Sequence, residues 1–314
     1  MSGAIWFFGT GFFAARCLEN IASSNRPELV VTAPPSVAGR GLKTKPSPVE
    51  ETALRLNLTL RHSDSVNRDE ELLALFAERR PDAILVIDFG QKVGQPWLNG
   101  VKYGCINIHP SLLPKYRGAA PVQRAVIDGQ RETGVTLFRL VEKMDAGPIW
   151  QQTRTLIGEN ETAGELFERL ADEGCSLFEK NAGSLFNGEA VFLAQDDAVA
   201  TLAPKIDKTE ARIDPSLPSK KIHDLVRGLQ PAPGAYFEFR GKRVKVLKTL
   251  CCPQGGESGE LFVREGTPCL ACGDGSVALL LVQPEGKKPM DGSSWLKGIR
   301  LVSHEKINQH QSLN

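Results

Sequence analysis

Short apolar runs alternate with amphipathic stretches through the first half of the chain. The runs are rich in β-branched and aromatic residues, as expected for parallel strands buried on both faces, and the stretches between them repeat with helical spacing. The strands predicted in this way are Ala4–Phe8, Glu28–Thr32, Asp82–Ile87, Cys105–Ile108, Gly134–Leu140 and Ile149–Leu156. The predicted helices are Phe12–Ala22, Val49–Leu56, Asp69–Arg79, Ala119–Asp128 and Thr162–Asn187. This order predicts a Rossmann-like α/β domain with a mostly parallel, doubly wound sheet.

The pattern changes after the stretch 188–204. Ile222–Leu229 has helical spacing, and short β-prone runs separated by Gly and Pro turns follow it. These runs are Ala235–Phe239, Val244–Leu250, Glu260–Val263, Pro268–Cys272 and Val277–Val282. Short strands at such intervals are typical of a small antiparallel barrel. We therefore predict a catalytic domain over 1–188, a linker over 189–204 and a smaller β domain over 205–314.

Composition indicates an ordinary globular protein, with 41% hydrophobic and 24% charged residues in 314. The apolar runs are of strand length, and the N-terminus has no basic segment before its first run, so we expect a cytoplasmic protein without a membrane partner. We also expect a monomer. Residues 205–314 carry 17 Lys and Arg against 12 Asp and Glu, whereas the rest of the chain carries 21 against 25. The C-terminal part, at +5, is the part suited to a polyanion.

The segment 104–124 holds the most informative residues. Asn107 and His109 lie two positions apart in a β-prone run, so both side chains project to the same side of the strand. Pro110 and Pro114 then prevent regular structure. An amide beside an imidazole suits reactions at a carbonyl, because the amide can donate to a developing oxyanion while the imidazole moves protons. The alternative is an ordinary strand-to-loop connection with a solvent-facing histidine.

A third polar group is expected near this pair. Asp145 lies at a strand-to-loop junction, in the segment 142–149, and is followed by a permissive glycine at 147. A carboxylate there would orient the imidazole. A simple turn-capping role for Asp145 is the alternative.

The segment 104–124 closely resembles the active-site signature of the folate-dependent formyltransferases. Its continuation over 117–124 resembles the branch that formylates methionyl-tRNA, and the resemblance extends to 142–149, 205–214 and 283–290. It implies transfer of the formyl group of 10-formyltetrahydrofolate to the α-amino group of methionyl initiator tRNA, an OB-like C-terminal domain and no metal. Asn107, His109 and Asp145 would be the catalytic residues. Asn107 would stabilise the oxyanion and His109, positioned by Asp145, would supply acid–base help.

The same resemblance implies a folate site at the carboxyl ends of the strands. Backbone groups of one strand end would bind the pterin, and two loops would complete the site. The implied residues are Ile87, Asp88, Phe89, Gly90, Ser111, Leu112, Leu113, Pro114, Lys143 and Met144. Many relatives have Tyr where this chain has Phe89, and often no acid at Asp88, but contacts through the backbone tolerate both departures.

For tRNA, the resemblance implies contacts from a basic, glycine-punctuated loop and from the C-terminal domain. The residues are Arg40, Lys43, Lys45, Lys205, Lys287 and Lys288. The family's usual loop carries an additional cation, and this chain has Pro35, Ser36 and Val37 at the corresponding positions. Spaced cations on a solvated surface are the alternative interpretation.

The residues leave several other interpretations open. Gly9 and Gly11 after the first strand fit a dinucleotide-binding fingerprint, although the second strand ends without the acid that binds ribose. A formyltetrahydrofolate hydrolase or a sugar-amine formyltransferase would share the catalytic trio. A pure RNA-binding protein would leave the trio unexplained. Finally, four cysteines within residues 251–272 permit a zinc site, but reduced structural thiols fit their spacing better.

Overall fold

The computed structural model describes residues 3–38, 43–302 and 305–308. The chain divides into two compact units. Unit 1 contains residues 1–119, 133–155 and 167–203, and unit 2 contains residues 120–132, 156–166 and 204–314. Residues 189–203, predicted as a linker, thus cluster with unit 1, while two short segments of the predicted catalytic domain, 120–132 and 156–166, belong to unit 2.

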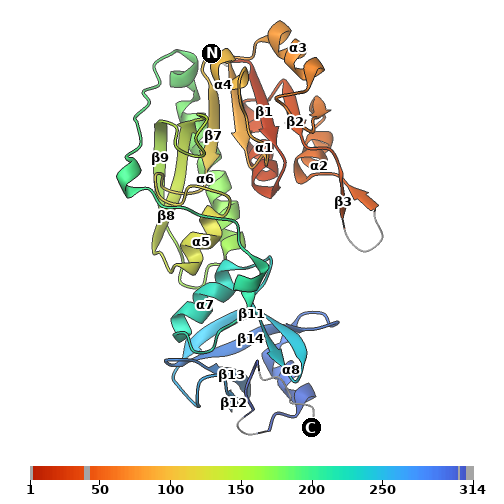
Figure 1. Cartoon of the computed structure of the whole chain (residues 1–314), viewed down its shortest axis with the longest axis vertical. Coiled ribbons are helices and arrows are strands. Elements are labelled where there is room, and N and C mark those ends of the chain that lie inside the picture. Colours follow the sequence, from red (N-terminus) through yellow and green to blue (C-terminus); the bar gives the residue numbers. More distant parts are fainter. Residues whose placement is uncertain (1–2, 39–42, 303–304, 309–314) are drawn as a thin grey trace. The chain divides into compact units, whose positions relative to one another are not determined.

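Unit 1 is built on a seven-stranded sheet with the order β5-β2-β1-β6-β7-β8-β9 (Figure 1). Its strands are β1 (Ile5–Gly9), β2 (Leu29–Thr32), β5 (Leu60–His62), β6 (Ala83–Ile87), β7 (Cys105–His109), β8 (Glu132–Arg139) and β9 (Ile149–Leu156). The pairs from β5 through β7 are parallel, and β8 joins β7 antiparallel. The predicted mostly parallel α/β sheet is confirmed.

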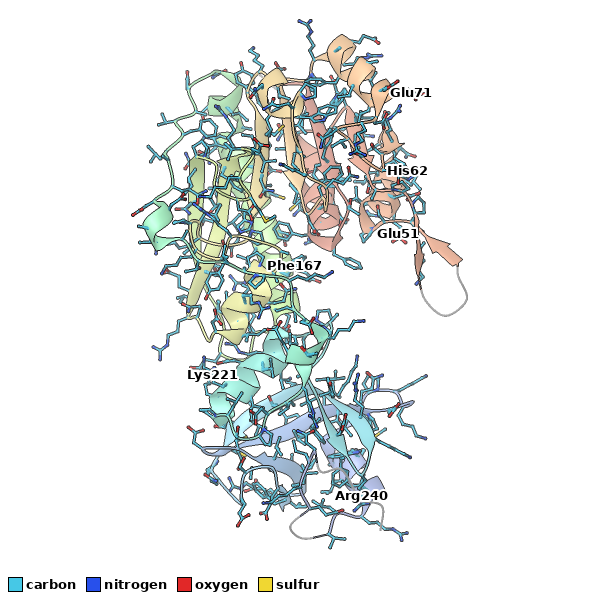
Figure 2. All side chains as sticks on the ribbon, viewed as in Figure 1. Glu51, His62, Glu71, Phe167, Lys221 and Arg240 are labelled. Atoms are coloured by element: carbon cyan, nitrogen blue, oxygen red, sulfur yellow. The ribbon has the colours of Figure 1, made fainter. Side chains whose placement is uncertain are left out.

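The apolar runs become central strands because both of their faces are covered. Every residue of β1 and β6 is buried. On one face, Trp6 and Phe8 pack in a cluster with Phe76 and Trp97. Elsewhere in unit 1, Phe13 meets Phe167 edge-on, with ring centroids 4.9 Å apart (Figure 2). The helices of this unit are α1 (Phe12–Ser24), α2 (Pro48–Arg55), α3 (Glu70–Arg79), α4 (Trp97–Gly100) and α6 (Ala163–Phe186), whose first turn lies in unit 2.

The stretch after β2, predicted only as a Pro- and Gly-rich loop, contains a hairpin. Strands β3 (Ser36–Ala38) and β4 (Lys43–Lys45) pair antiparallel, with Ser36 opposite Lys45. Arg40 lies outside the described residues. The sequence does not show the hairpin because such short strands carry no periodic apolar signal.

Unit 2 is an antiparallel sheet in the order β10-β11-β14-β13-β12, with β15 paired to β14. The strands are β10 (Tyr236–Phe239), β11 (Lys242–Cys252), β12 (Leu261–Arg264), β13 (Thr267–Ala271), β14 (Ser276–Pro284) and β15 (Met290–Asp291). The helices are α5 (Pro121–Ile127), α7 (Ser219–Gly228) and α8 (Gly292–Ile299). Phe237, Phe239 and Trp295 lie in its core. The predicted small antiparallel β architecture is confirmed as a half-barrel sheet.

Among the described residues, none of the helices is both long and apolar enough to cross a membrane.

Candidate active site

Asn107 and His109 lie at the carboxyl end of β7, beside the end of the parallel strand β6. Cys105, Ile106 and Ile108 of the same strand are buried in the sheet. Side chains alternate along a strand, so the two polar groups share one side at the edge where the carboxyl ends meet.

The amide of Asn107 is oriented by the neighbouring strand. Its Nδ2 donates to the carbonyl oxygen of Val86 at 2.7 Å, which identifies that end as the NH₂ group, because a carbonyl can only accept. Its Oδ1 is buried and has no hydrogen-bond partner among the described residues. A buried acceptor without a partner costs about 1–3 kcal/mol, and a bound ligand can remove that cost. Asn107 also has a second N–H, which has no partner among the described residues and could serve such a ligand.

His109 is only 5% exposed and is held between two oxygen atoms. Its Nε2 lies 3.0 Å from the carbonyl oxygen of Tyr116, so Nε2 carries a hydrogen. Its Nδ1 lies 3.9 Å from Oδ2 of Asp145. That separation exceeds a direct hydrogen bond but is within ion-pair range. Nδ1 is therefore the nitrogen left to exchange a proton, next to a carboxylate.

Asp145 comes from the loop 140–148 between β8 and β9 and has a left-handed backbone conformation, with φ of +48°. Its Oδ2 accepts a hydrogen bond from the backbone N–H of Gly118 at 2.8 Å. Gly147 allows the close approach of this loop to β8, because a Cβ there would lie 1.8 Å from the carbonyl oxygen of Arg139. The structure thus brings His109 and Asp145 together as the sequence predicts.

The loop after β7 is tied to the sheet by two polar side chains. The Oγ1 of Thr136 accepts from the N–H of Leu113 and donates to the carbonyl of Ser111, and Gln152 donates to the carbonyl of Leu113. Ser111 is fully buried and its hydroxyl donates to the carbonyl of Lys115. Among the predicted folate residues of this loop, Leu112 and Pro114 are the ones that keep side-chain surface.

The predicted pterin segment ends β6. Ile87 and Phe89 are buried, with the Phe89 ring 5.4 Å from that of Phe8. Asp88 and Gly90 are exposed and both have positive φ. A Cβ atom placed on Gly90 would have no other atom within 4 Å, so the backbone there has room for a ligand. On the other predicted loop, Lys143 forms an ion pair with Asp197 at 2.6 Å, and Met144 is 72% exposed.

Asp88 occupies the start of helix α1. Its carbonyl accepts the N–H groups of Thr10 and Gly11, and its carboxyl accepts those of Phe13 and Ala14. These N–H groups are the ones that would bind a pyrophosphate in a dinucleotide site. Because the carbonyl and the carboxyl of Asp88 already accept hydrogen bonds from these N–H groups, the structure argues against an oxidoreductase.

Asp88 also makes stability depend on pH. The residue is exposed as a whole, but its carboxyl packs on Gly11, and this burial raises the pKa of Asp88 to about 6, against its two N–H donors. A raised carboxyl pKa means that the folded chain holds a proton that the unfolded chain releases. Stability therefore falls as pH rises from about 4 to about 6 and stays at the lower level above that range.

We expect Asp88→Asn to flatten this fall and to stabilise the protein at neutral pH. The gain should be about 1 kcal/mol or less, because Asp88 as a whole is exposed and nearby solvent reduces the effect of burying its carboxyl. Thermal unfolding of both proteins at about pH 4.5 and pH 7.5 checks this. Asp64→Asn, at another exposed acid, is the control and should keep the wild-type pH dependence. An unchanged slope in Asp88→Asn would contradict the assignment.

The predicted tRNA residues are distributed over both units. Lys43 lies on β4, and Lys45 is exposed at the end of the same strand. Lys205, Lys287 and Lys288 are exposed in unit 2, as are Lys221 and Arg240 (Figure 2).

The cysteines do not form a metal centre among the described residues, which contain no cluster of three or more suitable ligands. Cys252 and Cys269 approach to 4.0 Å between sulfur atoms, Cys272 is buried and Cys251 is exposed. Burial raises the pKa of Cys269 and of Cys272 to about 12. Such thiols stay protonated and behave as small apolar side chains.

Comparison with known proteins decides the family. Residues 3–181 match the family described as Formyl transferase, and residues 205–300 match the Formyl transferase C-terminal domain. The chain belongs to the formyl transferase family. The methionyl-tRNA formyltransferase of Methylobacterium nodulans is 40% identical over 94% of this chain and 96% of its own length. That of Cereibacter sphaeroides is 39% identical over 94% and 96%.

A solved formyl transferase supports the fold. The N-formyltransferase of Helicobacter canadensis, in complex with folinic acid and dTDP-3-aminofucose, superposes with a TM-score of 0.66 over 90% of this chain and 100% of its own. At 19% identity this likeness concerns the fold alone.

Residues around the site that the sequence did not indicate lie in the stretch predicted as a linker. Gln195 and Asp197 contact the loop that carries Asp145, and Asp197 also contacts Arg117 in the loop after β7. The only local signal is a short polar run in an otherwise irregular segment, which does not differ from an ordinary linker.

Proposed function

We propose that this formyl transferase moves the formyl group of 10-formyltetrahydrofolate to the α-amino group of methionyl initiator tRNA. The observation that carries the chemistry is the amide of Asn107, on the same side of β7 as His109, whose Oδ1 is buried and has no partner among the described residues. The choice of acceptor rests on the methionyl-tRNA formyltransferases that match over nearly their whole length.

The reaction begins with attack of the neutral methionyl amine on the formyl carbon. As that carbon becomes tetrahedral, the free N–H of Asn107 donates to the formyl oxygen and stabilises its charge. Nδ1 of His109 exchanges the proton that passes from the amine to the departing folate nitrogen, and Asp145 holds the imidazole in place. The amine is the nucleophile, so no covalent intermediate with the protein is needed.

The folate would lie against the backbone of 87–90 and the loops that carry Leu112, Pro114 and Met144, where surface is exposed. Arg40, Lys43, Lys45, Lys205, Lys287 and Lys288 are proposed to contact tRNA phosphates. We further propose that the catalytic domain is 1–188 and the tRNA-binding domain 205–314, and that the enzyme acts as a cytoplasmic monomer without a metal.

The test is formyl transfer from 10-formyltetrahydrofolate to methionyl initiator tRNA, with free methionine and uncharged tRNA as control acceptors. Formylation of the charged tRNA alone supports the proposal. Release of formate without formylated tRNA would indicate a hydrolase, and formylation of a dTDP-linked amino sugar would indicate a sugar-amine formyltransferase.

For the tRNA surface, we expect the double change Lys287→Ala and Lys288→Ala to raise KM for methionyl-tRNA and to leave KM for the folate unchanged. Each lost phosphate contact should reduce the slope of log KM against log salt by about 1. Lys297→Ala, an exposed cation of the same unit, is the matched control. If Lys297→Ala raised KM for methionyl-tRNA as much as the double change, Lys287 and Lys288 would act only through their positive charge and not through specific contacts.

A further inference from the structure

Residues 193–203, here called the strap, lie against the loop after β7 and the loop that carries Asp145. The backbones of Leu193 and Ile149 exchange two hydrogen bonds next to the Asp145 loop. Further on, the N–H of Arg117 donates to the carbonyl of Thr201, and the N–H of Ala203 donates to the carbonyl of Arg117. The strap therefore joins the loop after β7 to the loop before β9, and all of these residues belong to unit 1.

The side chain of Gln195 connects the strap to the Asp145 loop. Its Nε2 donates to the carbonyl oxygens of Asp145, at 2.9 Å, and Gly147, at 2.7 Å. Its Oε1 accepts from Nε and from Nη2 of Arg117, at 3.1 and 2.7 Å. An amide has two donor hydrogens and two acceptor lone pairs, so Gln195 uses its whole hydrogen-bonding capacity here.

Arg117 holds Gln195 in this orientation. Its guanidinium is nearly buried, with the side chain 6% exposed, and it also forms an ion pair with Asp197 at 2.8 Å. Since arginine can only donate, the oxygen of the Gln195 amide must face it and the nitrogen must face the two carbonyls. The orientation of the amide follows from its partners on both sides.

The contact bears directly on Asp145. Its backbone carbonyl is held by Gln195, while its carboxyl is held by the N–H of Gly118. Gly118 is itself pressed on the strap, because a Cβ there would lie 2.7 Å from the carbonyl oxygen of Ala203. The strap thus restrains the backbone of Asp145 directly, through Gln195, and its carboxylate indirectly, through Gly118. The left-handed backbone of Asp145 needs such support.

We infer that Gln195 is a positioning residue for formyl transfer, which acts by holding the Asp145 loop so that the carboxylate orients His109. This inference rests on the proposed function. It assigns a role in the reaction to a segment that its composition presents as a linker.

The sharpest test is Gln195→Glu. Glutamate keeps the size of the side chain and an oxygen for Arg117, but replaces the donating nitrogen by an oxygen that faces two carbonyls. We expect kcat for formyl transfer to fall about 10–100-fold, because small displacements of a positioned group cost this much, while KM for both substrates stays within about 3-fold. The control is Val199→Ala, an exposed strap residue that should behave as wild type.

Two further readouts separate positioning from general loss of structure. In the double variant with Asp145→Asn, Gln195→Glu should lower kcat no further than Asp145→Asn alone, since both changes act on one group. In addition, the Gly118 N–H should exchange with solvent about 10-fold faster in Gln195→Glu than in wild type or Val199→Ala, because its acceptor is displaced. Nuclear magnetic resonance measures this without any substrate.

Multiplicative losses in the double variant, or unchanged exchange at Gly118, would overturn the inference. If wild type does not formylate methionyl-tRNA, the proposed function fails, whereas the Gly118 measurement still decides whether Gln195 holds Asp145. Faster exchange confined to Gly118 and its neighbours supports the inference, and faster exchange throughout unit 1 overturns it in favour of a structural role.

Discussion

The His109→Ala protein is expected to lose about 10²–10⁴-fold in kcat for formyl transfer, with much smaller changes in KM. The imidazole is nearly buried between the carbonyl of Tyr116 and the carboxylate of Asp145, and its Nδ1 is the ring nitrogen left to exchange a proton. Its loss removes proton transfer in the transition state while the surfaces proposed to bind both substrates remain. Steady-state kinetics with each substrate varied in turn measure the change in kcat and the change in each KM.

A second variant at the same position tests the assignment of the ring nitrogens. In His109→Gln the side-chain amide can still donate to the carbonyl of Tyr116 in place of Nε2, but it cannot exchange a proton. It should therefore fold as well as wild type and be as slow as His109→Ala. His62→Ala is the control, since His62 lies in the same unit and pairs with Glu50 away from this site. Recovery of most activity by glutamine would assign His109 a structural role.

The Asn107→Ala protein is expected to lose about 10²–10³-fold in kcat, the usual effect of removing one oxyanion donor. The free N–H of Asn107 is positioned before substrate arrives, because the other N–H is bonded to the carbonyl of Val86. Substrate binding should change less than kcat, since the charge on the formyl oxygen develops only in the transition state. Single-turnover formylation with saturating enzyme measures the chemical step directly.

Asn107→Ala also removes a side-chain bond to a backbone carbonyl, and this effect needs its own control. Asn181→Ala removes an amide-to-carbonyl bond of the same length, 2.7 Å to Leu177, from helix α6. Its single-turnover rate should stay within about 2-fold of wild type, because Asn181 does not face the site. An Asn107→Ala rate equally close to wild type would remove Asn107 from the mechanism.

Local patterns in the sequence were sufficient for most of the sheet and for the placement of Asn107 and His109. Strands β1, β2 and β6 are predicted correctly because every residue in them is buried and both faces must be apolar. The short strand β5 is partly exposed and was not predicted. The pair Asn107 and His109 is predictable because the two-residue period of a strand places both on one side whatever the rest of the fold does. The resemblance at 104–124 then connects that pair to its chemistry.

Only the tertiary structure decided what supports the trio. Gln195 lies 50 residues beyond Asp145, and nothing in its neighbourhood distinguishes it from a solvated linker residue, so its bonds to Asp145 and Gly147 become visible only when the strap is folded onto the loops. The capping of α1 by Asp88 is similar, because it depends on β1 and β6 being adjacent in the sheet. Hydrophobic periodicity is a local property of the chain and can be read along it. Hydrogen bonds between polar residues far apart in the sequence depend on how the elements pack. They cannot be predicted from local patterns along the chain.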